Sequence, residues 1–152
     1  MPIKGMDNVK KAIAKNKREA NDAVKGVYFS GLELIVKGTP TDEGRARNNW
    51  FLSVGTPFSL SGRADDKAGS GSYSSIETMP NYILNKKIYF SNNLPYIEKL
   101  EYGGFPTPVK KGSYIKKTKS YQKLSSGGFS LQAPDGWVRK AIVLMQQKIK
   151  QL

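Results

Sequence analysis

The stretch Gly38-Thr-Pro-Thr-Asp-Glu-Gly44-Arg-Ala-Arg-Asn-Asn-Trp50 decides how this chain folds, because the hydrophobic periodicity changes across it. Before it, apolar residues recur every three or four positions, as in a helix; after it, they alternate, as in a strand. Gly38 tolerates the left-handed conformation that often ends a helix, and Pro40 prevents the helix from resuming. We therefore predict a helix-to-strand corner, with Gly44 as a second hinge.

Upstream of the corner, the segment from about Asp7 to Lys37 is predicted to be one long helix with Asp7 as its N-cap. Its apolar stripe consists of Val9, Ile13, Ala20, Val24, Val27, Gly31 and Ile35. Basic residues crowd the first half, which we expect to be solvated. At about 1.5 Å per residue the helix would be roughly 45 Å long, more than a domain of this size needs. The first half is either frayed or a projecting helix that docks on a neighbouring subunit.

Downstream of the corner, a strand from Arg47 to Gly55 should turn Trp50, Leu52 and Val54 toward the core. A mobile loop should follow from Pro57 to about Ser75, because Gly, Ser, Asp and Lys dominate it. The remaining predicted elements are a short helical turn near Pro80, a strand over Lys86–Ser91, a short helix over Leu94–Tyr102, and a last helix whose first turn holds Pro134 and Asp135 and which ends near Gln151.

Composition bounds the function. The 152 residues form a single domain, and the chain contains neither cysteine nor histidine. It therefore lacks the usual general base at neutral pH, thiolate chemistry and the commonest metal ligand. Carboxylates, serines and lysines show no recognisable catalytic arrangement, so we predict no enzyme, no cofactor and no metal. No stretch is long and apolar enough for a membrane span, and we expect a soluble protein made inside a cell.

The basic residues exceed the acidic ones by 13, with 25 Lys and Arg against 12 Asp and Glu. Part of this excess lies in a lysine-rich insertion over about 105–130, which is either a flexible arm or a β-hairpin. Its lysines are Lys110, Lys111, Lys116, Lys117, Lys119 and Lys123, interleaved with tyrosines. Lysine can contact phosphate and tyrosine can stack on bases, so this insertion could contact DNA or an acidic partner. A solvated lysine-rich hairpin would have the same composition.

Three stretches, in this order, resemble a known family. They are Thr39–Trp50, with the pattern Pro-x-Asp-x-Gly-Arg-x-Arg; Ile88–Gly103, with Asn-x-x-Pro-Tyr-x-x-x-Leu-Glu-Tyr-Gly; and Gln132–Arg139, with Gln-x-Pro-x-Gly-x-Val-Arg. Together they resemble the tail-completion, or head-to-tail joining, proteins of long-tailed bacteriophages, the group containing minor tail protein Z. The lysine-rich insertion is where the chain departs from that family.

The resemblance implies an α+β fold, with a small, mainly antiparallel sheet packed by the N- and C-terminal helices. It also implies a structural virion protein that forms a hexameric ring in the phage neck, assembled in the host bacterial cytoplasm. There the ring would meet the tail tube or tail terminator on one side and the head connector or stopper on the other, with viral DNA passing through its lumen. The alternative is a basic nucleic-acid-binding module that acts as a free protein.

Four residues beside the motif glycines are candidates for fixing loops or contacting other subunits: Arg45, Arg47, Glu101 and Tyr102. Two structural alternatives stay open. In one, Tyr102 packs on the sheet; in the other, Arg45 pairs with Glu101 inside the subunit. Trp50 and Trp137 are expected in the core.

Overall fold

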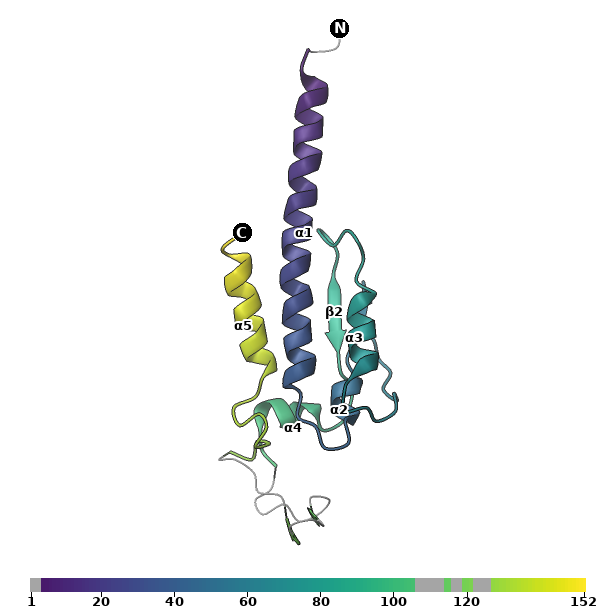
Figure 1. Ribbon diagram of the computed structural model, residues 1–152, viewed down its shortest axis with the longest axis vertical. Helices are drawn as coiled ribbons and strands as arrows, with labels where there is room; N and C mark the ends of the chain where they lie inside the picture. Colours follow the sequence, from purple (N-terminus) through teal and green to yellow (C-terminus); the bar gives the residue numbers. More distant parts are fainter. Residues whose placement is uncertain (1–3, 106–113, 116–118, 122–126) are drawn as a thin grey trace.

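Nine helices and strands follow one another in the computed structural model, which describes residues 4–105, 114–115, 119–121 and 127–152. In chain order they are α1 (Met6–Gly38), α2 (Arg45–Asn48), β1 (Phe51–Val54), α3 (Ser70–Glu77), β2 (Ile88–Ser91), α4 (Ile97–Tyr102), β3 (Tyr114–Ile115), β4 (Ser120–Tyr121) and α5 (Val138–Ile149). Figure 1 shows α1 in the middle, α5 on one side of it, and β2 with α3 on the other. The predicted α+β class is confirmed.

The long helix α1 is continuous from Met6, and its first half extends well beyond the other elements (Figure 1). The side chains of this half are exposed, as predicted. Asp7 lies in the first turn, where its charge complements the helix dipole, but the N-cap is Gly5 in a left-handed conformation. The prediction that Asp7 is the N-cap was therefore wrong.

The corner is held by Thr39 and Gly44. The Thr39 hydroxyl donates to the carbonyl of Ile35 at 2.7 Å and accepts the indole N–H of Trp50 at 2.9 Å, so it closes α1 and anchors the next strand. Gly44 has φ of 93°, and a Cβ there would lie 2.2 Å from the backbone of Asp66. Only glycine fits this position, because a side chain would be both strained and in collision.

The strand after the corner is shorter than predicted, because the single turn of α2 takes up Arg45–Asn48. β1 pairs with β2 in antiparallel register, with Leu52 opposite Phe90 and Val54 opposite Ile88. Trp50 and Leu52 are buried as predicted, but Val54 at the end of the strand is exposed. The prediction for Val54 was therefore wrong.

The second edge of β1 is covered by a helix. Ser72 of α3 accepts the backbone N–H of Trp50 at 2.9 Å, and Ser75 accepts that of Leu52 at 2.8 Å. These hydroxyls satisfy the backbone donors that a third strand would otherwise take. The sheet can therefore remain two-stranded although one edge is buried.

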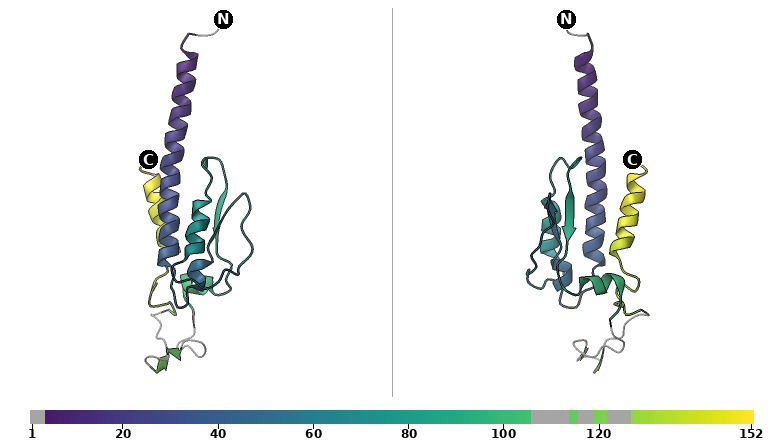
Figure 2. Two further views of the ribbon diagram at one scale, coloured as in Figure 1. Left: turned by 45° about the vertical axis from the view of Figure 1, so that its right-hand side comes forward. Right: turned by 180° about the vertical axis from the view of Figure 1, so that it is seen from behind.

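One hydrophobic cluster joins all these layers. Its buried members are Leu32, Ile35, Val36, Trp50, Leu52, Ile76, Met79, Ile83, Ala133, Trp137 and Ala141. The two tryptophans lie in the core, as predicted. On the α5 side the helices approach closely, since a Cβ on Gly31 would lie 2.1 Å from Sδ of Met145. Figure 2 shows α5 and the α3–β2 layer on opposite sides of α1.

The segment predicted as a mobile loop over 57–75 differs from that expectation in two respects. Its last part is helical, because α3 begins at Ser70. The rest is anchored to the corner by two side-chain amides: Asn49 accepts from the N–H groups of Gly62 and Arg63, both at 3.0 Å, and Asn48 donates to the carbonyl of Ala64 at 2.8 Å. Polar anchoring replaces the apolar burial that the segment lacks.

Candidate functional site

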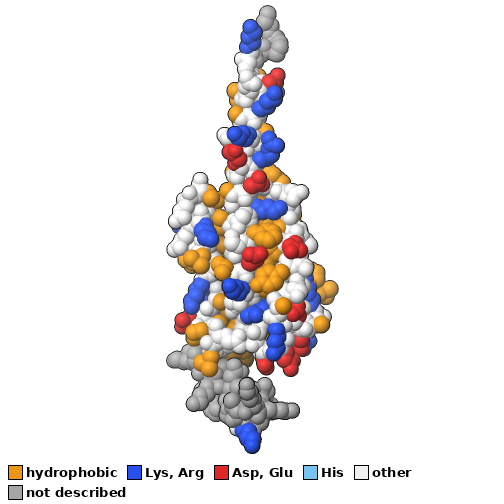
Figure 3. Space-filling view, in the orientation of Figure 1, with side chains coloured by type: hydrophobic (Ala, Val, Ile, Leu, Met, Phe, Trp, Pro, Cys, Tyr) orange, Lys and Arg blue, Asp and Glu red, His pale blue; other side chains and the backbone are white. Residues whose placement is uncertain are grey.

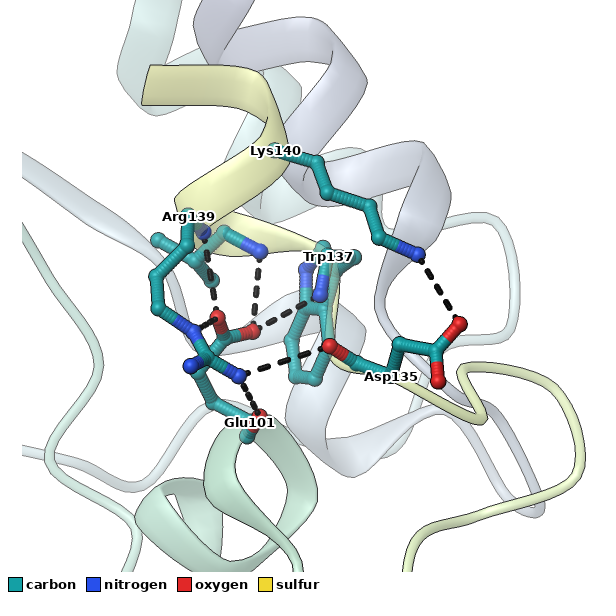
Figure 4. Close-up of polar contacts among 6 residues, drawn as sticks. Glu101, Asp135, Trp137, Arg139 and Lys140 are labelled. Carbon is teal, nitrogen blue, oxygen red and sulfur yellow. Dashed lines mark hydrogen bonds and ion pairs between the residues drawn. The ribbon is translucent and has the colours of Figure 1, made fainter. Parts of the chain in front are cut away.

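Glu101, at the end of α4, is the hub of the polar contacts at the lower end of the body (Figure 4). Its side chain is buried, yet both carboxylate oxygens have donors. Oε2 accepts the backbone N–H groups of Trp137 at 2.8 Å and Val138 at 2.9 Å. Oε1 accepts the backbone N–H of Arg139 at 3.1 Å and its Nε at 2.8 Å. Glu101 thus caps α5 from outside the helix, because a carboxylate satisfies the free N–H groups of a first turn.

This cap explains where α5 begins. Pro134 and Asp135 were predicted in the first turn, but they precede the helix, which starts at Val138. Gly136, with φ of 78°, separates them from it, and a Cβ there would lie 2.4 Å from the carbonyl oxygen of Glu101. The turn before α5 is therefore shaped to admit α4.

The environment keeps Glu101 ionised. Burial by itself would raise its pKa, but the hydrogen bonds from the Trp137 N–H, from the Arg139 side chain and from the next two backbone N–H groups outweigh that effect. The net pKa is lower than that of an ordinary glutamate. The carboxylate is consequently ionised at neutral pH and places a negative charge at the start of α5.

Tyr102 lies beside this hub and faces solvent, with 62% of its surface exposed. The guanidinium of Arg139 lies 4.7 Å from the centre of its ring. The alternative in which Tyr102 packs on the sheet was therefore wrong. The alternative in which Arg45 pairs with Glu101 was also wrong, because Arg139 is the partner and Arg45 is exposed. Tyr102 and Arg139 together form a small exposed cation–π surface.

The lysine-rich insertion leaves and re-enters the body next to Tyr102. The N–H of Gly104 donates to the carbonyl of Gly127 at 2.8 Å, and that of Phe105 donates to Gly128 at 3.2 Å. A Cβ on Gly103 would lie 2.6 Å from the Gly127 oxygen, so glycine is needed for this close approach. These contacts bring the two ends of the insertion together at one root.

Within the insertion, β3 pairs with β4 in antiparallel register. Of the two alternatives, arm or hairpin, the described residues form a hairpin. Lys119 is exposed. The other lysines named as candidate contacts, Lys110, Lys111, Lys116, Lys117 and Lys123, lie outside the described residues.

Arg47 fixes the corner from inside the subunit. Its Nη1 donates to the carbonyl of Lys67, and its Nη2 donates to the carbonyls of Lys37 and Thr39, all at 3.0 Å. The end of α1 is thereby tied to the segment before α3. Of the two roles predicted for Arg47, fixing a loop is the one that these bonds perform.

Residue-by-residue reasoning missed Arg139, Gln132 and the two asparagines of the corner. The side-chain amide of Gln132 forms two hydrogen bonds with the backbone of Thr41, donating to its carbonyl at 2.7 Å and accepting its N–H at 2.9 Å. All of these residues lie in the three stretches that carry the family resemblance. The sequence did contain a signal for Arg139. Glu101 lies between apolar helix positions and therefore requires hydrogen-bond donors, and the next motif along the chain contains such a donor, Arg139.

Among the described residues, no three or more acidic side chains are grouped so that they could hold a metal ion. Asp66, which lies near the corner, accepts the N–H groups of Ala68 and Ser70 at 2.9 and 2.8 Å, and so closes the first turn of α3. None of the described helices combines the length and hydropathy needed to cross a membrane. Comparison of the chain with protein-family models, with curated proteins and with solved structures gave no match.

Proposed function

We propose that this chain is a structural joining protein of a tailed bacteriophage, a tail-completion protein that forms a hexameric ring at the head-proximal end of the tail. The ring lies between the tail tube or tail terminator and the head connector, and DNA passes through its lumen. The protein acts by docking, and the three stretches that resemble the family serve to shape the docking body.

The observation that carries this proposal is that the three resembling stretches meet at one end of the body. Gln132 of the third stretch is hydrogen-bonded to the backbone of Thr41 in the first. Glu101 of the second stretch caps α5 at the third. Asn92 of the second donates to the carbonyl of Ala46 in the first at 2.8 Å. Hydrogen bonds between residues far apart in sequence thus link the three stretches to one another. A structural framework common to the family would require such links.

The shape of the molecule adds support. The exposed half of α1 projects at one end, and the root of the lysine-rich insertion lies at the other end (Figure 1). A protein that joins two assemblies needs contact surfaces facing in two directions. The body between these ends is filled by the hydrophobic cluster that contains both tryptophans.

Electron microscopy tests the proposal. The purified chain at high concentration should form rings whose class averages have six-fold symmetry, and a gold-labelled antibody should mark the neck of particles of the phage that encodes it. Label on the capsid shell or the tail tip, or a chain that stays monomeric and leaves the particles unlabelled, would refute the proposal.

A nucleic-acid-binding module remains the second candidate, favoured by the basic residues on the exposed half of α1 and by the exposed Lys119. It predicts that the monomer binds random double-stranded DNA at physiological salt, with an affinity that falls steeply as salt is added. The joining role predicts weak or no binding by the monomer. Fluorescence anisotropy with a labelled random duplex, measured at two salt concentrations, separates the two.

A further inference from the structure

The first half of α1 has no packing partner within the described chain. Its side chains are exposed throughout Met6–Ala20, and 55% of Val9 and 50% of Ile13 are accessible to solvent. Helix α5 packs against the second half only: Met145 lies at Gly31 and Trp137 at Gly38. In Figure 1 the C-terminus lies beside the middle of α1, and the remainder of the helix continues alone.

The exposed half carries the same apolar stripe as the packed half. Met6, Val9 and Ile13 lie three and four residues apart and continue, at helical spacing, into the buried positions Val27 and Ile35. Alternating steps of three and four are the seam spacing by which one helix packs along another. Since α5 already packs along the second half of α1, the free continuation has the geometry to accept another helix.

Charge defines which helix would fit. Residues 4–20 contain six basic side chains and two acidic ones. Lys10 follows the seam residue Val9 directly and therefore flanks the seam, and Lys17, seven residues later, lies on the same side of the helix. Lys11 and Arg18, also seven residues apart, fall on the opposite face. Figure 3 shows Lys and Arg side chains along this projection, together with hydrophobic side chains and acidic ones.

A second copy of this chain is disfavoured as the partner. Pairing two such helices would bring lysine-flanked seams together, and like charges across a helix interface are repulsive. The outer surface of α5 offers exposed leucine and valine, but it is basic too, with Arg139, Lys140 and Lys148. The exposed half of α1 and the outer surface of α5 are therefore both basic, so neither surface complements the other in charge.

We propose that the exposed half of α1 docks a helix of a different protein, one whose apolar seam is flanked by carboxylates. The seam residues provide burial, and Lys10 and Lys17 select acidic flanks and orient the partner. This inference deepens the proposed function by naming the chemistry of one neighbour in the joint, and it rests on that function only for the partner's place in a virion.

The probe is a synthetic helical peptide of about three heptads, with isoleucine and leucine at its seam and glutamate on both flanks. A second peptide has lysine in place of every glutamate. Isothermal titration calorimetry with the full chain should detect binding of the acidic peptide and none of the basic one. Val9→Ser with Ile13→Ser should abolish binding; both side chains are exposed, so the thermal unfolding midpoint should stay unchanged.

Two charge-matched variants make the test specific. Lys10→Glu with Lys17→Glu should weaken binding of the acidic peptide by about tenfold or more. Lys11→Glu with Arg18→Glu makes the same change in net charge on the far face and should weaken it less than about threefold. Equal losses in the two variants would show general charge attraction and overturn the proposal, as would an acidic peptide that fails to bind.

The outcome is separable from the test of the joining role. Six-fold rings and gold at the neck, without binding of the acidic peptide, would refute this inference alone. Peptide binding with no label at the neck would refute the joining role alone.

Discussion

Nε of Arg139 donates to Oε1 of Glu101 across 2.8 Å, and this contact ties the end of α4 to the first turn of α5. The glutamate is 5% exposed while half of the arginine side chain faces solvent. The buried member of the pair, Glu101, therefore caps α5, and the exposed member is Arg139. The pair lies between the core and the root of the lysine-rich insertion.

Replacing the buried carboxylate should destabilise the fold. Glu101→Gln keeps the shape but loses the charge, so the hydrogen bonds to the α5 N-terminus weaken, and we expect the free energy of unfolding to fall by about 2 kcal/mol. Urea denaturation measures it. Glu98→Gln is the control on the same helix, since Glu98 is exposed and should change the value by less than about 0.5 kcal/mol. Equal effects of the two would contradict the capping role.

The same carboxylate should make stability depend on pH. Because the pKa of Glu101 is lowered in the folded state, its contribution is complete at neutral pH, declines as pH falls below the ordinary glutamate value, and is lost once the folded-state pKa is passed. The difference in unfolding free energy between the wild type and Glu101→Gln should therefore shrink between pH 7 and pH 3. Urea midpoints at intervals of pH measure it. A constant difference would exclude an ionised cap.

Two glycines of α1 should respond to alanine with opposite signs. Gly26 has open space around it, so Gly26→Ala should stabilise the protein by about 0.5 to 1 kcal/mol through helix propensity. At Gly31 the new Cβ would collide with Met145, and overpacking should outweigh that gain, leaving a net loss of about 1 kcal/mol. Thermal unfolding midpoints compare them. Stabilisation by both would show that α5 does not pack closely on α1.

The serine support of β1 can be tested in α3. Ser72 accepts the N–H of Trp50 and donates to the carbonyl of Arg47 at 2.7 Å. Ser72→Ala leaves both buried groups unpaired and should lower the unfolding free energy by about 2 kcal/mol. Ser74→Ala, at an exposed position of the same helix, should lie within about 0.5 kcal/mol of the wild type. If Ser72→Ala had as small an effect as Ser74→Ala, the Trp50 N–H and the Arg47 carbonyl would have other hydrogen-bond partners.

Arginine geometry should matter at the corner. Arg47→Lys keeps the charge but loses the planar fork that reaches three carbonyl oxygens, so we expect a loss of about 1 to 2 kcal/mol. Arg45→Lys is the matched control two residues earlier, because Arg45 is exposed. Chemical denaturation of both variants decides whether the fork or the charge alone is required.

Several predictions from the sequence were confirmed because they depend on local chemistry. The helix α1 followed from its apolar stripe, and the corner from Pro40 and Gly44. The strand predicted over Lys86–Ser91 from alternation is formed over Ile88–Ser91. The left-handed conformation predicted for Gly38 was wrong, because this residue is the last of α1. The hydrogen bonds by which Asn48 and Asn49 hold the segment over 57–69 were not predicted. Side-chain amides that bond a distant backbone leave no periodic trace in a sequence.

The sequence by itself determined the long helix before the corner, the two buried tryptophans and the solvation of the first half of α1. These follow from periodicity and residue polarity, which act over a few neighbouring positions. Only the tertiary structure decided that Glu101 belongs to Arg139 rather than Arg45, that α3 covers the free edge of β1, and that α5 begins at Val138. Each of those outcomes depends on which donors and acceptors meet after the core has closed, and a buried polar group takes whichever partner packing places within reach.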